Sequence, residues 1–362
     1  MDLGIVGLER SGKTSVFNAV TGGHARAGAY GATEANIGVV KVPDERLDRL
    51  CALLEPRKVT YAEARYLDVP GGLSFRGEGP EPAYLASLSE CDALVHVVRA
   101  FQDEAVPHPE GSVDPDRDIE GVNMELAFAD LALIERRRDK LDIAVRSARP
   151  GQREAGEREL VLLQRLREAL EREEPLRTQE LSPDERHMIS GYQLLTNKPL
   201  LILANIDEAE VGRAQEIESA LAARWAGPSV EVAALCGKLE AELTELSDEE
   251  AAEFRRELGL AEGGLERMIR LSQQVLGLIS FFTVGEPEGR AWALPAGSTA
   301  LVAAGKIHSD IARGFIRAEA IGWDELLDCG SLAEARKRGL LRREGKGHIV
   351  QDGELLNILF NV

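Results

Sequence analysis

Cysteine and histidine are scarce in this chain, and neither type is clustered. The 362 residues include four cysteines without a CxxC pair and six scattered histidines. This scarcity excludes a disulfide framework and a zinc knuckle. The longest apolar runs, such as Pro199–Ala204, fall far short of the ~20 residues that a membrane span needs, and Met1–Gly4 does not begin like a signal peptide. We therefore expect a cytoplasmic protein with reduced thiols and no membrane partner.

Basic residues are also few compared with acidic ones. There are 43 Lys and Arg against 62 Asp and Glu, a net charge of -19. This excess excludes a chain whose whole surface binds nucleic acid, so we expect no DNA partner. Residues 281–362 carry 10 basic and 11 acidic side chains, a net of -1, which leaves -18 for the rest of the chain. An RNA contact would therefore have to be local.

The most informative motif is GxxxxGK[ST] at residues 7–14. It follows a strand-like stretch at residues 3–6 and precedes a helix-like one at residues 15–20, and this context disfavours a glycine-rich turn that matches by chance. Such a loop wraps its backbone N–H groups around phosphates. Lys13 is expected to neutralise the β- and γ-phosphates, and the Thr14 hydroxyl to bind Mg²⁺. The expected nucleotide-binding residues are Arg10, Ser11, Gly12, Lys13, Thr14 and Ser15.

A second motif, DxxG, follows the strand-like stretch Tyr61–Leu67. An Asp at the carboxyl end of such a strand typically reaches Mg²⁺, so Asp68 is a candidate metal residue, here through a water. Gly71 supplies an N–H that can sense the γ-phosphate. The alternative is a simple Asp turn.

The residues that should read the base follow a buried strand pattern at Pro199–Ala204. GTPases have NKxD at this place, and its Asp accepts two hydrogen bonds from guanine. This chain keeps Asn205 but has Ile206 at the Lys position and Glu208 at the Asp position. The extra methylene moves the carboxylate out of hydrogen-bond reach. We therefore expect ATP to be preferred over GTP, with Asn205 binding adenine N7 and N6.

A further strand-like stretch at residues 229–234 leads to Cys236-Gly237-Lys238. This triplet is shaped like the SAK motif, which closes over the base with backbone N–H groups. Cys236, Gly237 and Lys238 are therefore expected to complete the nucleotide site.

The middle of the chain has a helical pattern. Leucine and isoleucine recur at helical spacing through residues 118–145 and again through residues 160–170, on either side of Pro150-Gly151. Two long amphipathic helices joined by such a turn predict an antiparallel coiled-coil hairpin. The run Arg136–Arg138 is either a solvated helix face or part of a partner-binding arm.

From Ser280 the pattern changes to short strands and turns. One basic cluster follows, and it could make several phosphate contacts with RNA or be ordinary surface charge. Its members are Arg336, Lys337, Arg338, Arg342, Arg343 and Lys346.

Together these motifs resemble the Obg-like ATPase family (YchF), a branch of the P-loop GTPases whose altered base motif favours ATP. The resemblance covers nearly the whole chain. Its supporting segments are the P-loop, residues 33–40, 77–79, 92–101 and 290–318, and the ending Asn357–Val362.

The resemblance implies an α/β fold, with a mostly parallel P-loop GTPase-like sheet, an inserted antiparallel α-helical coiled-coil hairpin and a C-terminal β-grasp (TGS) domain. It also implies slow Mg²⁺-dependent ATP hydrolysis that switches association with the ribosomal large subunit or structured RNA, with Thr33 as a further Mg²⁺ residue. The expected domains are residues 1–117 and 197–279 for nucleotide binding, 118–196 for the helical insertion and 280–362 for the β-grasp.

The chain departs from the family pattern near the phosphates. Arg10-Ser11 replaces the usual Asn-Val, Thr33 stands one position late, and the stretch after Asp68 is shorter by about two residues. Arg10 could act as an arginine finger supplied in cis, which makes it a candidate catalytic residue with Lys13. Alternatively it faces solvent or pairs with Glu34.

The residues leave three functions open. The first is a slow ATPase switch. The second is a nucleotide-gated binding module with negligible hydrolysis, because no glutamine follows Gly71 to orient water. The third is a true GTPase of the same family.

Overall fold

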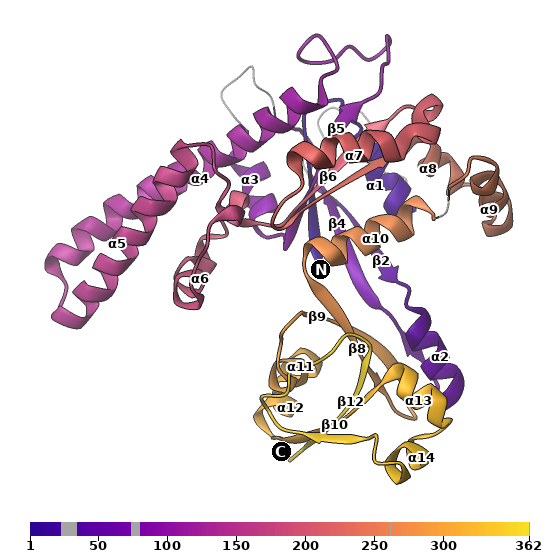
Figure 1. Cartoon of the computed structure of the whole chain (residues 1–362). Coiled ribbons are helices and arrows are strands. Elements are labelled where there is room, and N and C mark those ends of the chain that lie inside the picture. The colour runs from indigo at the N-terminus through magenta and orange to yellow at the C-terminus, as the bar shows by residue number, and fades with distance from the viewer. Residues whose placement is uncertain (23–34, 74–79, 261, 362) are drawn as a thin grey trace. The chain divides into compact units, whose positions relative to one another are not determined.

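The computed structural model describes residues 1–22, 35–73, 80–260 and 262–361 (Figure 1). Expectations for Thr33, Glu34 and residues 77–79 lie outside this range. The chain forms two compact units. We name them the N-terminal unit, residues 2–38 and 65–275, and the C-terminal unit, which comprises Met1 and residues 39–64 and 276–362.

The N-terminal unit is built on a six-stranded sheet in the order β2-β4-β1-β5-β6-β7. Strand β1 pairs in parallel with β4 and β5, and β5, β6 and β7 are also parallel neighbours. Strands β5 and β6 are buried almost throughout, as central strands of a sheet with helices on both faces should be. The strands are β1 (Asp2–Val6), β2 (Asn36–Val42), β4 (Ala62–Asp68), β5 (Ala93–Ala100), β6 (Leu200–Ile206) and β7 (Val230–Leu235).

Helices pack on this sheet. The loops that carry the motifs follow the carboxyl ends of its strands. In the described part of the N-terminal unit, the α-helices outside the insertion are α1 (Lys13–Thr21), α3 (Pro82–Ser89), α7 (Ala214–Trp225), α8 (Gly237–Leu243), α9 (Asp248–Glu257) and α10 (Gly264–Val275). The short 3-10 helix η4 (Glu208–Arg213) follows β6 directly.

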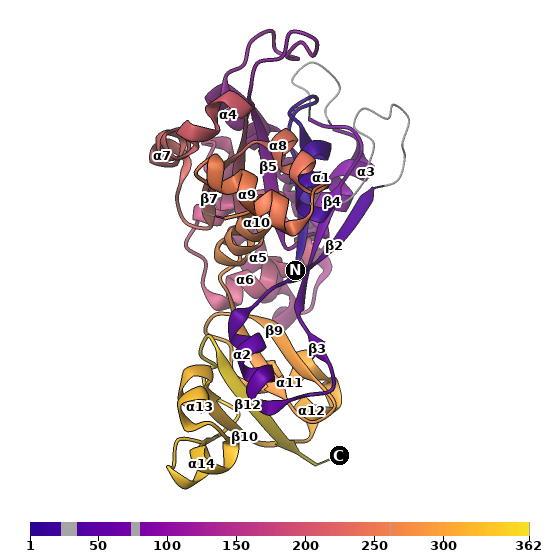
Figure 2. The ribbon, with the colours of Figure 1, turned by 90° about the vertical axis from the view of Figure 1, so that its right-hand side faces the viewer.

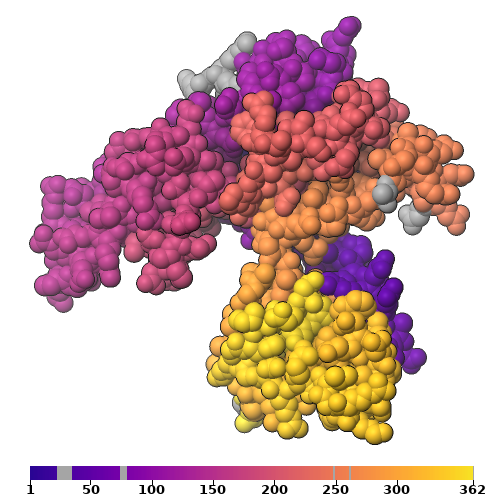
Figure 3. All heavy atoms as spheres, viewed as in Figure 1, coloured from indigo at the N-terminus to yellow at the C-terminus, as the bar shows by residue number. Residues whose placement is uncertain are grey.

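The insertion forms two long helices, α4 (Pro115–Ser147) and α5 (Pro150–Glu171), which run side by side (Figure 1). In the space-filling view of Figure 3 the arm is a continuous body of atoms. Ile134, Leu163 and Leu166 are fully buried in this seam. Short helices complete the base of the arm: η1 (Leu176–Thr178), α6 (Pro183–Ile189), η2 (Ser190–Tyr192) and η3 (Leu195–Asn197). The predicted helical insertion is therefore present.

The C-terminal unit has a second six-stranded sheet, in the order β11-β10-β12-β8-β9-β3. Its pairs are antiparallel except β12 with β8 and β3 with β9. The elements are α2 (Glu45–Leu54), β3 (Val59–Thr60), β8 (Leu278–Val284), β9 (Gly289–Pro295), α11 (Ala300–Ile307), α12 (Ser309–Arg313), β10 (Phe315–Gly322), α13 (Trp323–Cys329), α14 (Leu332–Lys337), β11 (Arg342–Glu344) and β12 (Glu354–Phe360).

Both faces of this second sheet are covered by helices. Phe281 packs on one face with α11 and α12, and its neighbour Phe282 packs on the other with α2 and α13. This alternation follows from the two-residue period of a strand. Figure 2 shows α2 and α13 in the same unit, where they pack against each other.

The position of α2 corrects the expected domain boundaries. Residues 39–64 were expected in the nucleotide-binding part, yet they belong to the C-terminal unit. Leu47 and Leu50 are fully buried there, and Arg46 pairs with Asp352 at 2.8 Å and lies 5.5 Å from the Phe282 ring centroid. The segment contributes to one of the two helical layers that cover the second sheet. Because its apolar side chains are buried against that sheet, it is part of the C-terminal unit.

The fold class is confirmed: an α/β protein with a mostly parallel sheet, a helical insertion and a C-terminal sheet domain. No helix in the described part of the chain is long and apolar enough to cross a membrane.

Candidate nucleotide site

The loop between β1 and α1 requires glycine at two positions. A Cβ on Gly7 would lie 2.4 Å from the Val97 carbonyl oxygen, and one on Gly12 would lie 2.1 Å from Nδ2 of Asn205. Gly12 also has φ +92°, a conformation that other residues rarely adopt. The loop is therefore pressed against the ends of β5 and β6, where a parallel sheet holds its ligands.

Lys13 is buried beneath this loop. Its ammonium donates to the carbonyl oxygens of Gly7, at 3.2 Å, and Leu8, at 2.9 Å. Burial lowers the pKa of Lys13 to about 8, although the charges of Asp68 and Glu9 oppose this change. Lys13 is thus held where phosphates would meet the loop, with a weakened preference for the charged form.

Thr14 and Asp68 form the pair expected to hold Mg²⁺. The Thr14 hydroxyl donates to Oδ2 of Asp68 at 2.8 Å, and Nδ2 of Asn36 lies 3.4 Å from the same oxygen. Asp68 is buried at the end of β4. A hydroxyl and a carboxylate fit Mg²⁺, which uses few protein ligands and completes its shell with water and phosphate. Sequence analysis assigned no role to Asn36, which lies outside the two motifs.

The segment after Asp68 packs directly on the P-loop. The Leu73 amide donates to the Gly7 carbonyl at 3.2 Å, and a Cβ on Gly72 would lie 2.9 Å from Nζ of Lys13. Gly71 has φ +97° and open space around its Cβ position. The shortened stretch therefore brings backbone, rather than a side chain, against the lysine.

Asn205 joins the P-loop to the loop after β7. Its Nδ2 donates to the Ser11 carbonyl at 3.0 Å, and its Oδ1 accepts from the Gly237 amide at 3.0 Å. The expectation that Asn205 serves both N7 and N6 of adenine stays a prediction. One Nδ2 proton remains for N7, and Oδ1 keeps a second lone pair for the N6 amino group.

The neighbours of Asn205 differ in where their side chains lie. Ile206 is 2% exposed and its side chain packs in the core, so only its backbone is left to contact a nucleotide, and its expected binding role stays a prediction. Asp207 accepts from the Ala209 amide at 3.0 Å and caps η4. Glu208 is exposed at the start of η4, at the position that sequence analysis assigned to base selection.

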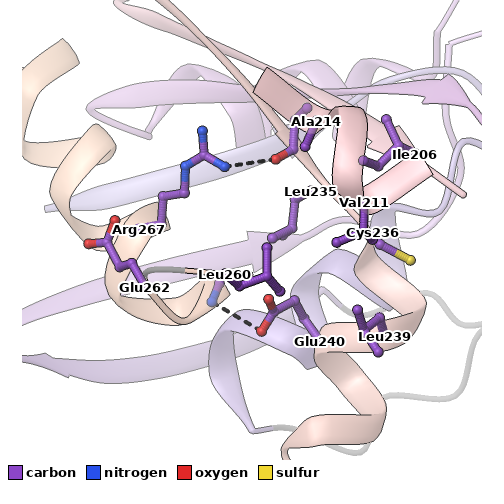
Figure 4. A pocket seen from close by; sticks show the side chains of 12 residues that line it. Ile206, Val211, Ala214, Leu235, Cys236, Leu239, Glu240, Leu260, Glu262 and Arg267 are labelled. Atoms are coloured by element: carbon purple, nitrogen blue, oxygen red, sulfur yellow. Dashed lines mark hydrogen bonds between the residues drawn. The ribbon is translucent and has the colours of Figure 1, made fainter. Parts of the chain in front are cut away.

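A small cavity lies behind these residues, lined by Ile206 and Cys236 (Figure 4). Glu240 borders it and accepts from the Gly264 amide at 3.0 Å. Cys236 is 5% exposed, so its side chain belongs to this interior rather than to the nucleotide site. Lys238 is exposed instead, with its ammonium 4.0 Å from Glu242.

Arg10 is hydrogen-bonded to the loop between β5 and α4. It has φ +62°, and its guanidinium donates to the Pro107 carbonyl at 3.1 Å. The loop that contains Pro107 is anchored by buried His108, whose Nε2 lies 2.9 Å from Asp118. Ser11 is 2% exposed, and its hydroxyl has no partner among the described residues.

Sequence analysis assigned no role to Phe101, which follows the carboxyl end of β5. Its Cε1 lies 3.8 Å from the position of a Cβ on Gly12, the same point that Asn205 approaches. The ring is therefore close to Asn205, the residue expected to bind the base. Its place after a central parallel strand is the signal that could have identified it.

The basic cluster of the C-terminal unit is largely neutralised by acidic neighbours. Four of its six side chains form ion pairs: Arg336–Glu319, Lys337–Glu334, Arg338–Glu334 and Arg342–Glu354, at 3.2, 3.8, 2.8 and 2.8 Å. Within the described residues, Arg343 and Lys346 have no such partner. The cluster thus offers fewer free cations than its sequence suggests.

Comparison with known proteins gives consistent matches over the whole chain. The family model described as "50S ribosome-binding GTPase" matches residues 2–134, and the model YchF-GTPase_C, described as "Protein of unknown function (DUF933)", matches residues 278–361. Proteins named "Ribosome-binding ATPase YchF" from Bacillus subtilis and Escherichia coli O157:H7 are 40% and 39% identical, each over 99% of both chains.

A solved structure also matches the chain at full length. The Schizosaccharomyces pombe YchF GTPase aligns with a TM-score of 0.84 and 29% identity, covering 99% of this chain and 97% of that one. The resemblance carried by the P-loop, the altered base motif and the C-terminal segments is thus confirmed, and the chain belongs to the YchF family of P-loop nucleotide-binding proteins.

Proposed function

We propose that this protein binds ATP with Mg²⁺ and hydrolyses it slowly, and that the nucleotide controls its association with the ribosome. The observation that supports this most directly is the joining of Lys13, Thr14 and Asp68 at one end of the sheet. The relatives named as ribosome-binding ATPases support the same activity and partner. A ribosome partner would place the protein in the cytoplasm.

Each residue of the site has a separate task in this proposal. The P-loop amides from Arg10 to Ser15 and the Lys13 ammonium bind phosphates, and Thr14 and Asp68 hold Mg²⁺. The ion would neutralise charge that develops on the phosphate oxygens. Thr33 is proposed as a further metal residue, outside the described range. Gly71 is proposed to sense the γ-phosphate through its amide.

The proposed hydrolysis is slow because the described residues next to the expected phosphate site include no side chain that orients the attacking water. Gly72 occupies the position after Gly71 and has no side chain to orient water. Arg10 would have to leave the Pro107 carbonyl to reach the phosphates, so its role as a catalytic cation stays a prediction. Phosphate release from ATP, compared with Lys13→Ala as background, separates a slow ATPase from a binding module with negligible hydrolysis.

ATP is the proposed nucleotide because Glu208 replaces the Asp that guanine requires. A guanine edge bound without its carboxylate leaves polar groups unpaired, at about 1–3 kcal/mol, or roughly a 5- to 150-fold weaker affinity. Gly237 and Lys238 would close over the base by their backbone amides. Titration of ATP and GTP, with Glu208→Asp as the matched variant, tests this choice. Equal affinities for the two nucleotides would contradict it.

The ribosomal large subunit, or a structured RNA, is the proposed macromolecular partner. Of the basic cluster, Arg343 and Lys346 have no carboxylate partner among the described residues, whereas Lys337 and Arg338 share Glu334. Replacing Arg343 and Lys346 by Ala should weaken ribosome co-sedimentation and reduce its salt slope by about two, one for each lost phosphate contact. The same change at Lys337 and Arg338 is the matched control, with a smaller effect.

A further inference from the structure

Arg99 is a guanidinium buried at the carboxyl end of β5, beside the nucleotide site. It pairs in register with Asn205 of β6 and is 2% exposed. Its Nε donates to the Phe101 carbonyl at 3.2 Å, and one terminal nitrogen lies 3.4 Å from the Asp103 carbonyl. The side chain therefore fixes the turn by which the chain leaves the sheet.

The same guanidinium also contacts the aromatic ring that this turn carries. Its central carbon lies 4.5 Å from the Phe101 ring centroid, which is stacking distance for a cation on an aromatic face. Phe101 is thus held twice, by its carbonyl and by its ring. Its edge points toward Gly12, next to Asn205.

This arrangement is costly for the folded chain. Within the described residues Arg99 has no ion pair with a carboxylate, and its second terminal nitrogen is buried without a hydrogen-bond partner. Burying a charge without such compensation is unfavourable. A role in holding the turn and its ring in one place would explain why the chain has such a costly buried side chain.

We propose that Arg99 is a positioning residue, which holds the Phe101 ring as the wall against which the purine base of the nucleotide rests. The inference depends on the proposed binding of ATP and adds a determinant of base affinity. Arg99 acts through Phe101 and does not touch the phosphates. Stacking of a base on an aromatic side chain contributes ~1–3 kcal/mol, so the ring accounts for roughly a 5- to 150-fold gain in affinity.

Titration calorimetry with two ligands tests this role. ATP has the base, whereas inorganic triphosphate has only the phosphates. Phe101→Ala should weaken ATP binding by the stated factor and leave triphosphate binding unchanged. Arg99→Lys keeps the charge but loses the planar fork that bonds the carbonyls and stacks on the ring, so it should also weaken ATP binding selectively.

The double variant distinguishes positioning from a general effect on the fold. If Arg99 acts through the ring, Arg99→Lys should have no further effect on ATP affinity once Phe101→Ala is present. Phe101→Tyr keeps the ring and should keep the effect of Arg99→Lys. Arg137, which lies 5.6 Å from the Tyr192 ring in the helical arm, offers a matched control: Arg137→Lys should leave ATP affinity unchanged.

Three results would overturn the inference. Additive losses in the double variant, or an equal fall in triphosphate affinity, would show that Arg99 supports the whole loop rather than the ring. Unchanged ATP affinity in Arg99→Lys would show that the ring needs no positioning. These outcomes leave ATP binding itself intact. Failure of the unaltered protein to bind ATP would instead overturn the proposed function and this inference with it.

Discussion

Gly72 is a position where a single added carbon should disturb the phosphate-binding lysine. A Cβ there would lie 2.9 Å from Nζ of Lys13, 3.0 Å from the Glu9 amide nitrogen and 3.1 Å from the Gly7 carbonyl oxygen. Two of these atoms are backbone, and the lysine is fixed by two carbonyls. The P-loop cannot retreat, because Gly7 already abuts the Val97 carbonyl.

Gly72→Ala must therefore displace either Lys13 or the Asp68–Leu73 segment. Overpacking of this kind costs ~1–3 kcal/mol. If the displacement takes the Lys13 ammonium away from the phosphates, the loss of one charge-assisted hydrogen bond, ~1.5–3 kcal/mol, should lower ATP affinity by roughly 10- to 150-fold. Gly72→Gln should lose at least as much affinity, and it should not gain the hydrolysis that a glutamine after DxxG supports in GTPases, because the same clash moves the phosphate-binding lysine.

Titration calorimetry with ATP and a phosphate-release assay measure both effects. Gly212→Ala is the matched control, because a Cβ on Gly212 meets nothing within 4 Å, and it should leave affinity and turnover unchanged. If Gly72→Gln bound ATP as tightly as the unaltered protein and hydrolysed it faster, the packing argument would be refuted.

Three further predictions concern stability and pH. Because burial lowers the pKa of Lys13 to about 8, ATP affinity should fall as pH rises through that value and the ammonium is lost, measured by calorimetry across it. Asp130→Ala should destabilise the protein by several kcal/mol in denaturant unfolding, because it strands the buried amides of Leu195 and Thr196, at ~1–3 kcal/mol each. Ser11→Ala removes a buried hydroxyl without a partner and should leave the melting temperature equal or higher.

The parts of the site that sequence analysis predicted well are those encoded by short contiguous motifs. The P-loop and DxxG fix both their chemistry and their place after a strand, so the meeting of Thr14 and Asp68 followed from the sequence. The helical insertion was equally predictable, because apolar residues recur at helical spacing in each of its two long segments, such as Ile134 in the first and Leu163 and Leu166 in the second. In each case residues that are close in the sequence determine the local structure and the position of the side chains.

A side chain's environment was not predictable where residues distant in the sequence determine it. The basic cluster looked free because Glu319 and Glu354, which pair with Arg336 and Arg342, are separated from them in the sequence. The motif position of Ile206 did not predict the burial of its side chain, because the orientation of that side chain depends on the packing of β6. Residues 39–64 gave no sign of their partner sheet, which begins more than two hundred residues later.

The placement of α2 also has a consequence during synthesis. Leu47 and Leu50 leave the ribosome early, yet the strands that cover them begin at Leu278. At roughly 5–20 residues per second, the intervening ~220 residues take roughly 10–45 s to translate. The apolar face of the helix stays uncovered on the nascent chain for that time. A chain that stops before Leu278 never covers it, so such products should be retained by chaperones and degraded.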